Sequence, residues 1–201
     1  MAKIKFTKNE LKNQRDALGR YERFLPTLRL KKEQLQGEVR RLSRELRDVR
    51  TRIDALEDEV RPWIALFDDP YDLAPFAAVE RLDKEVVNVV GVNVTELRGV
   101  VFARALPDLH DSPAWVDEAV QALRTRVELW MAERFLTAER ATLAEELRTT
   151  TQRVNLFEKV KIPETLDNIR RIRIFLGDQQ TAAVARAKLT KRKTSEQWRS
   201  A

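Results

Sequence analysis

Few side chains in this sequence have the type and spacing that catalysis requires. The only histidine, His110, lies between Asp108 and Asp111 in a loop-like stretch, and a lone histidine of this kind is typical of a solvated surface. The chain has no cysteine, which excludes thiolate chemistry and a disulfide framework. It also lacks a glycine-rich phosphate loop and any carboxylate set with metal-ligand spacing. We therefore predict no catalytic residue, no metal site and no cofactor.

The elements that carry the remaining charged side chains are long and amphipathic. From Leu11 to Trp63, apolar residues are spaced alternately three and four apart, and only Gln14 and Lys32 interrupt the apolar character. A period of 3.5 residues kept over this length is typical of a left-handed coiled coil, here roughly 80 Å long. The predicted seam of this first helix contains Leu11, Leu18, Leu25, Leu28, Leu35, Val39, Leu42, Leu46, Val49, Ile53, Leu56, Val60 and Trp63.

The limits of the first helix follow from local signals. Thr7 and Glu10 form a capping box, which predicts a start at residue 8. Pro26 lies within the seam register, so the helix either breaks or bends there, and the unbroken register on both sides favours a bend. We expect the helix to end by residues 68–70.

The middle of the chain differs in composition. Residues 85–103 are rich in valine and contain Gly91 and Gly99, which predicts two short strands in a hairpin with its turn within 91–96. A short helix is possible at 75–82, and residues 104–113 are predicted to be a loop. Because an isolated hairpin is marginal in water, we expect this one to lean on the helices or on a partner.

A second long helix is predicted from residue 113. Its apolar periodicity slips near 131–136 and again near Pro163, and Trp130, like Trp63, is expected in the core. Thr150 is either one polar layer on a solvated face or part of a hydrogen-bonded layer between helices. The seam residues predicted in this helix are Leu143, Leu147, Val154, Leu166, Ile169 and Leu176.

The predicted fold class is mainly α: a long antiparallel two-helix coiled coil with a small central insert that contains a β-hairpin. The expected segments are a first helix over 1–67, an insert over 68–112, a second helix over 113–190 and a polar tail over 191–201. If residue 8 pairs near residue 190, Pro26 lies near the level of 163–172, and Pro26 and Pro163 would share a bend.

Charge is distributed unevenly along the chain. The formal net charge is +6, with +6 in residues 1–35, +7 in residues 170–201 and therefore −7 between them. If the two ends lie together, one pole of the molecule is strongly positive. The sequence has no apolar run long enough to cross a bilayer and no signal peptide, so we expect a cytoplasmic protein without direct membrane insertion.

Several stretches resemble one family. The segment TTTQRVNLFEKVKIPETLDNIRRIRIFL (149–176), with RVN followed by IP, is similar to the C-terminal helix of the D subunit of V-type and archaeal A-type rotary ATPases. The N-terminal segment TKNELKNQRDALGRYERFLPTLRLKKEQL (7–35) resembles the start of the same family, and Asn88, Val89, Gly91, Val94 and Leu97 resemble its insert. The match is poor at 64–84 and 104–114.

The resemblance implies a non-catalytic central rotor shaft. In this family the terminal helices enter the hexamer of catalytic A and B subunits, and the middle region binds the small F subunit and sits on the C (or d) subunit above the membrane ring. The chain would be peripheral to the membrane through this complex. The positive pole implied to lie in the bore is Lys3, Lys5, Lys8, Lys12, Arg15, Lys188, Lys191, Arg192 and Lys193. The implied small-subunit contacts are Val86, Val89, Gly91, Val94, Leu97 and Val101.

Three other functions compete with this one. The γ shaft of F-type ATPases is also a helical hairpin, but the insert here is too short for the α/β domain that γ carries. A basic coiled coil could bind nucleic acid or an anionic membrane, yet the basic ends lack interleaved aromatic residues and a single wide apolar face. A plain structural tether is the third alternative, and we expect no nucleic-acid partner.

Overall fold

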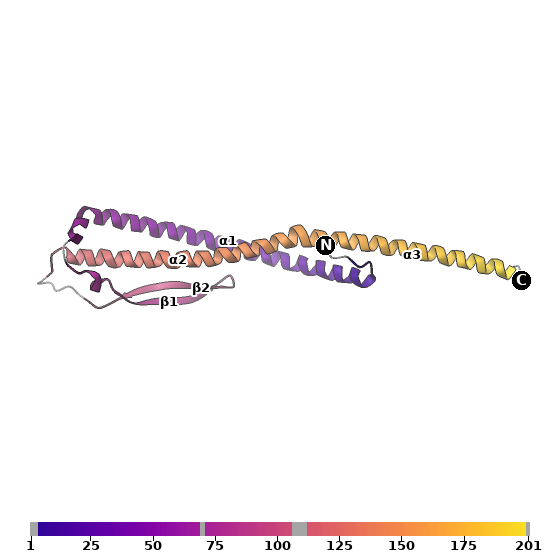
Figure 1. The fold of residues 1–201 in the computed structure, drawn as a ribbon, viewed down its shortest axis with the longest axis horizontal. Coiled ribbons are helices and arrows are strands. Elements are labelled where there is room, and N and C mark those ends of the chain that lie inside the picture. Colours follow the sequence, from indigo (N-terminus) through magenta and orange to yellow (C-terminus); the bar gives the residue numbers. More distant parts are fainter. Residues whose placement is uncertain (1–3, 69–70, 106–111, 200–201) are drawn as a thin grey trace. The chain divides into compact units, whose positions relative to one another are not determined.

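The computed structural model describes residues 4–68, 71–105 and 112–199, with side chains described up to residue 193. Figure 1 shows the long helices and the two-stranded hairpin that connects them in the chain, which confirms the predicted fold class. In chain order the elements are the α-helix α1 (Lys8–Val60), the 3-10 helices η1 (Arg61–Asp68) and η2 (Ala74–Phe76), the strands β1 (Val79–Val89) and β2 (Val92–Phe102), the α-helix α2 (Val116–Leu156), the π-helical turn η3 (Phe157–Lys161) and the α-helix α3 (Ile162–Arg199).

The chain forms two compact units. Residues 31–149 form the central unit, and residues 1–30 together with 150–201 form the terminal unit. Helix α1 starts in the terminal unit and continues into the central one. The predicted segments at 1–67, 68–112, 113–190 and 191–201 are continuous in the sequence. The two compact units divide the chain differently, because the terminal unit combines two segments that are far apart in the sequence.

The core of the central unit lies between α1, α2 and the hairpin. Leu35 and Leu42 of α1 pack with Leu143 of α2 and Val94 of β2, and a second cluster joins Val49, Ile53 and Leu129. Ion pairs cross between the helices in antiparallel order: Lys31–Glu146 at 2.7 Å, Arg50–Glu133 at 2.8 Å and Glu57–Arg126 at 3.4 Å. The seam predicted for the first helix is therefore the surface on which this unit is assembled.

The hairpin turns at two residues with positive φ. Val89 pairs with Val92, so the turn consists of Val90 (φ 52°) and Gly91 (φ 78°), which is the backbone pattern of a type I′ turn. The Asn88 side chain accepts a hydrogen bond from the Gly91 amide at 3.0 Å and donates one to Asn93 at 2.7 Å. A β-branched residue is strained at this φ, and Val90 is held there partly by its packing on the Leu35 cluster.

The sequence-based outline of the insert needs two corrections. The turn begins at Val90, one residue before the predicted window, and β1 begins at Val79, where a short helix had been considered possible. Within residues 75–82 the helical residues are only Pro75 and Phe76, which end the 3-10 turn η2. Charged residues from Glu80 to Glu85 hide the strand pattern, because both faces of a two-stranded ribbon reach solvent over much of its length.

The terminal unit is a second antiparallel helix pair. Phe6 contacts Phe175 with ring centroids 5.0 Å apart, Tyr21 contacts Phe157 at 5.2 Å, and Arg29 pairs with Glu158 at 2.7 Å. The assumed pairing of residue 8 with residue 190 is therefore wrong. Phe6, just before α1, lies beside Phe175, and α3 continues from there to Arg199.

A polar layer lies inside this pair. The Asn168 side chain, which is buried, donates a hydrogen bond to Gln14 at 3.4 Å. Thr150 is also buried, whereas its neighbours Gln152 and Arg153 are exposed. Of the two interpretations of Thr150, one polar layer on a solvated face fits the structure. The hydrogen bond between the two helices is made by Asn168 and Gln14 instead.

Two helix irregularities share one level of the terminal unit. Helix α1 runs through Pro26 without a break, and the contacts of Tyr21 and Arg29 place Pro26 opposite Phe157 and Glu158 rather than Pro163. These two residues begin the π-helical turn, in which the Ile162 amide donates to the Phe157 carbonyl. Pro163 has no amide proton and its ring would crowd the carbonyl four residues earlier, and a widened turn relieves that conflict.

Most predicted seam positions are covered, to different degrees. The buried ones are Leu25, Leu35, Leu42, Leu46, Val49, Ile53, Leu143, Val154 and Ile169. The half-buried ones are Leu11, Leu18, Leu28, Val39, Leu56, Val60, Trp63, Leu147 and Leu176. Leu166 is 49% exposed and lies outside the seam, and Trp130 is 43% exposed with Arg134 stacked on its ring, so neither is a core residue. The apolar periodicity slips at 131–136 and at the π-helical turn, so the apolar stripe changes its position around the helix near Trp130 and Leu166.

Replacing a fully buried seam leucine should destabilise the central unit strongly. Leu42→Ala leaves a cavity between α1, α2 and Val94, and we expect a loss of about 2–5 kcal/mol in the free energy of unfolding. The matched control is Leu30→Ala on the same helix, where the side chain is exposed, with an expected change within about 0.5 kcal/mol. Urea unfolding followed by circular dichroism measures both, and equal effects would contradict this account of the core.

The turn makes a separate prediction. Gly91→Ala forces a side chain into positive φ without any steric contact within 4 Å, so backbone strain alone should lower stability by about 1–2 kcal/mol. Gly99→Ala in β2 is the control, because its Cβ also meets open space but its φ is not positive. We expect Gly99→Ala to be neutral or slightly stabilising. Thermal unfolding measures both variants.

Candidate protein-binding surfaces

The described residues offer surfaces rather than a reaction centre. Among them, no group of three or more histidine, aspartate or glutamate side chains is arranged to hold a metal ion. The same part of the chain contains no helix that is both long and apolar enough to span a bilayer. His110 and Lys3, both singled out in the sequence, lie outside the described residues.

The part of α3 beyond Leu176 is a basic surface of the terminal unit. Every described side chain from Gly177 to Lys193 is exposed. This stretch carries one acidic residue, Asp178, and five basic ones: Arg186, Lys188, Lys191, Arg192 and Lys193. Lys5, Lys8, Lys12 and Arg15 are also exposed near the start of α1. Both predicted groups of basic residues therefore belong to one unit, as the positive pole requires.

A groove between α1 and α3 adds an apolar element to this unit. It encloses about 550 Å³, and Leu166 and Ile174 line it with a large part of their surface exposed. Arg15, Arg170 and Arg173 are also among its lining residues. Apolar contact flanked by guanidinium groups suits a partner segment that is both apolar and acidic.

The hairpin exposes only part of its predicted contact surface. Val86 is 68% exposed, and Gly91 at the turn is exposed as well. Val94 is buried in the chain's own core and is not available to a partner. The remaining predicted contacts, Val89, Leu97 and Val101, are half-buried. The expectation that the hairpin leans on the helices is thus met through Val94.

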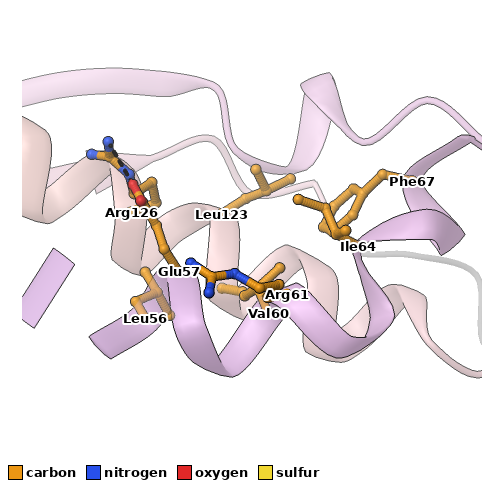
Figure 2. A pocket seen from close by; sticks show the side chains of 9 residues that line it. Leu56, Glu57, Val60, Arg61, Ile64, Phe67, Leu123 and Arg126 are labelled. Carbon is orange, nitrogen blue, oxygen red and sulfur yellow. Dashed lines mark ion pairs between the residues drawn. The ribbon is translucent and has the colours of Figure 1, made fainter. Parts of the chain in front are cut away.

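A second groove lies in the central unit where α1 ends and α2 begins. Figure 2 shows Leu56 and Val60 of α1, Ile64 and Phe67 of η1 and Leu123 of α2 around it, with the Glu57–Arg126 ion pair beside them. The space measures about 350 Å³, and Ile64 is 57% exposed. Phe67 stacks on Trp63 and meets Trp115 edge-on, which fixes η1 against the start of α2.

A smaller pocket beneath β2 contains the most unusual polar group. Glu139 of α2 is 5% exposed, and its Oε1 atom has no hydrogen-bond partner within the described chain. The nearest cation is the Arg41 guanidinium, whose Nη2 lies 3.8 Å away. Burial raises the pKa of Glu139, the nearby Glu96 carboxylate raises it further, and Arg41 opposes both effects.

The sequence did contain a signal for Glu139. It lies three residues after Leu136 and four before Leu143, so it occupies a seam position. An acidic residue on a long helix is ordinarily solvated, and Glu139 departs from this pattern because it is buried. The two grooves could not be found in the same way, because they depend on where η1 and α3 pack.

The Glu139 carboxyl should make stability depend on pH. Its pKa is raised in the folded chain above the ordinary value of 4.5, so the unfolded state ionises first as pH rises. Stability should therefore fall from about pH 4.5 upward and level off above the raised pKa. In Glu139→Gln this decline should be absent, so the variant gains stability over the wild type as pH rises. Glu145→Gln, at an exposed position of α2, is the control, and an identical pH profile for all three chains would contradict the assignment.

Comparisons with known proteins agree on one family. Residues 10–192 match the family model that describes the D subunit of ATP synthase. The chain is 38% identical to the V-type ATP synthase D subunit of Borreliella burgdorferi, over 95% of both chains. It is 33% identical to the protein of the same name from Chlamydia caviae, over 97% of this chain and 95% of the relative. These matches span nearly the whole chain, including both helix pairs and the hairpin, and the protein therefore belongs to the ATP synthase D-subunit family.

Proposed function

We propose that this chain is the non-catalytic central rotor shaft of a V-type or A-type ATPase or ATP synthase. It would transmit torque between the catalytic A and B subunits and the membrane ring that moves protons or sodium ions. The observation that carries the proposal is the antiparallel pairing of α1 with the helices that return along it, through an apolar seam, in a chain of the D-subunit family.

The helix pairs are suited to carrying load. In the central unit, buried leucines interlock over several turns, and ion pairs at Lys31, Arg50 and Glu57 cross between α1 and α2 at intervals. Relative sliding of the helices would separate many apolar contacts at once. The hydrogen bond from Asn168 to Gln14 opposes a change of register in the terminal unit, because a shifted pair would leave the buried Asn168 amide without this acceptor.

The positive pole is the part we assign to the bore of the catalytic hexamer. The described residues of α3 from Gly177 to Lys193 are all exposed, so this end of the helix can be enclosed by other subunits. Its lysines would attract acidic loops through long-range charge, which holds the shaft without a fixed geometry. A shaft that turns needs attraction of this kind rather than tight complementary packing.

The remaining surfaces supply two other contacts in this proposal. The exposed strand surface around Val86 would bind the small F subunit. The surface around Ile64 and Phe67, which line this groove, would contact the C or d subunit above the membrane ring. The chain would then be cytoplasmic and peripheral, attached to the membrane only through the complex.

The direct test is co-expression with the A, B and F subunits of the same organism. We expect one affinity step to isolate a complex that contains this chain and hydrolyses ATP. A chain that fails to join the complex, but is retained on DNA or on vesicles containing phosphatidylserine in a salt-sensitive way, would overturn the proposal in favour of a basic coiled coil.

The bore assignment makes a quantitative prediction. The triple variant Lys188→Glu, Lys191→Glu, Lys193→Glu should associate with the A and B hexamer at least about tenfold more slowly at low ionic strength, with a smaller difference at high salt. The matched control is Arg44→Glu, Arg47→Glu, Arg52→Glu, three exposed positions of α1 in the central unit. Stopped-flow association of labelled chains measures both, and equal slowing by the two variants would remove the basis for placing α3 in the bore.

A further inference from the structure

The pocket beneath β2 brings a buried acid to a place where three elements meet. Glu139 comes from α2, Glu96 and Leu97 come from β2, and Arg41 and Glu45 come from α1. The pocket measures about 240 Å³, more than a single water molecule occupies. A buried carboxylate with an oxygen that accepts no hydrogen bond is costly, because the charge loses its hydration without compensation. Such a group in a native protein calls for a specific partner.

The two arginines beside this pocket, Arg41 and Arg98, are hydrogen-bonded to other acids. The Arg41 Nε atom donates to Glu38 at 2.8 Å and its Nη1 atom donates to Glu45 at 2.8 Å. Only Nη2 faces Glu139, at 3.8 Å, which is an ion-pair distance without a hydrogen bond. Arg98 donates to Glu85 at 2.7 Å and pairs with Glu96 at 3.1 Å. Glu45 and Glu96 each have an arginine of their own, so Glu139 is the acid of this pocket whose Oε1 atom has no hydrogen-bond donor.

Half of the lining residues are apolar: Leu97, Ala132, Phe135 and Leu136. A lining that combines acids with hydrocarbon matches a basic side chain, whose methylene stem packs on apolar surface while its charged end donates hydrogen bonds. The Phe135 ring already attracts one cation, since the Lys84 Nζ atom lies 5.6 Å from its centroid. A metal ion is a poorer fit, because the described residues offer no cluster of three or more suitable ligands.

We infer that this pocket receives a lysine or arginine side chain of the small subunit, with Glu139 and Glu96 as its acceptors. The inference rests on the proposed function, in which the small subunit binds beside the hairpin. A side chain inserted here touches β2, α1 and α2 together, so it fastens the hairpin to the helix pair at the moment of binding. The raised pKa of Glu139 agrees with this role, because a carboxyl without its cationic partner holds its proton more tightly.

The test compares Glu139→Gln with Glu145→Gln in complexes with the purified small subunit, using isothermal titration calorimetry. Glutamine keeps the shape but removes the charge, so we expect Glu139→Gln to weaken affinity at least about tenfold. Thermal unfolding of the unbound variant should be unchanged or shifted upward, since a buried charge has been removed. Glu145→Gln should bind within about twofold of the wild type, because an exposed charge contributes little. Loss of affinity with gain of stability is a combination that a merely structural residue would not give.

A double-mutant cycle identifies the inserted residue. Each lysine and arginine of the small subunit is changed to methionine and combined with Glu139→Gln. We expect one of them to show strong coupling and the others to be additive. Wild-type affinity for Glu139→Gln, or additivity at every basic position, would overturn this inference alone. If the wild-type chain forms no complex with the small subunit, the assignment of that subunit to the hairpin falls as well.

Discussion

The burial of one apolar stripe between two antiparallel helices is the constraint on which the rest of the structure depends. Neither helix pair has a globular core, and each unit consists largely of a seam with solvent on both sides. The hairpin also depends on that seam. Two strands are marginal in water, and β2 is held because Val94 enters the cluster of Leu35, Leu42 and Leu143. The turn at Val90 and Gly91 then packs its strained valine on the same cluster.

Polar residues within the seam have distinct physical consequences. The buried Asn168 side chain donates a hydrogen bond to Gln14, and this bond favours one register of the terminal pair. Thr150 is small enough to be buried without opening the helices. Glu139 differs from both, because its environment penalises its charge and supplies no donor at hydrogen-bond distance to Oε1. A seam that needed only stability would have an apolar residue here. The acid is better explained by a contact outside the chain.

The apolar periodicity was enough to predict the fold class, but it could not predict the offset between the helices, the start of β1 or the grooves. The three-and-four spacing from Leu11 to Trp63 placed the seam of α1 correctly, since a period kept over so many turns has few alternative interpretations. The offset between the helices could not be derived, because seams of leucine and valine pack almost equally well one heptad apart. Contacts such as Phe6–Phe175 and Arg29–Glu158 fix it. The start of β1 was missed because charged residues on an exposed ribbon carry no burial pattern. The two grooves depend on tertiary placement alone.

The π-helical turn at Phe157–Lys161 changes the phase between the two parts of the second long helix. A turn of this type accommodates one residue more than an α-helical turn, and one residue corresponds to about 100° of rotation around the helix axis. The side chains before and after the turn are therefore phased separately toward α1. Removing one residue from this turn would restore a regular helix locally, but the side chains that follow would rotate by about 100° and the buried Ile169 and Ile172 would leave the seam. The widened turn thus allows one continuous helix to keep an apolar seam on both sides of an irregular point.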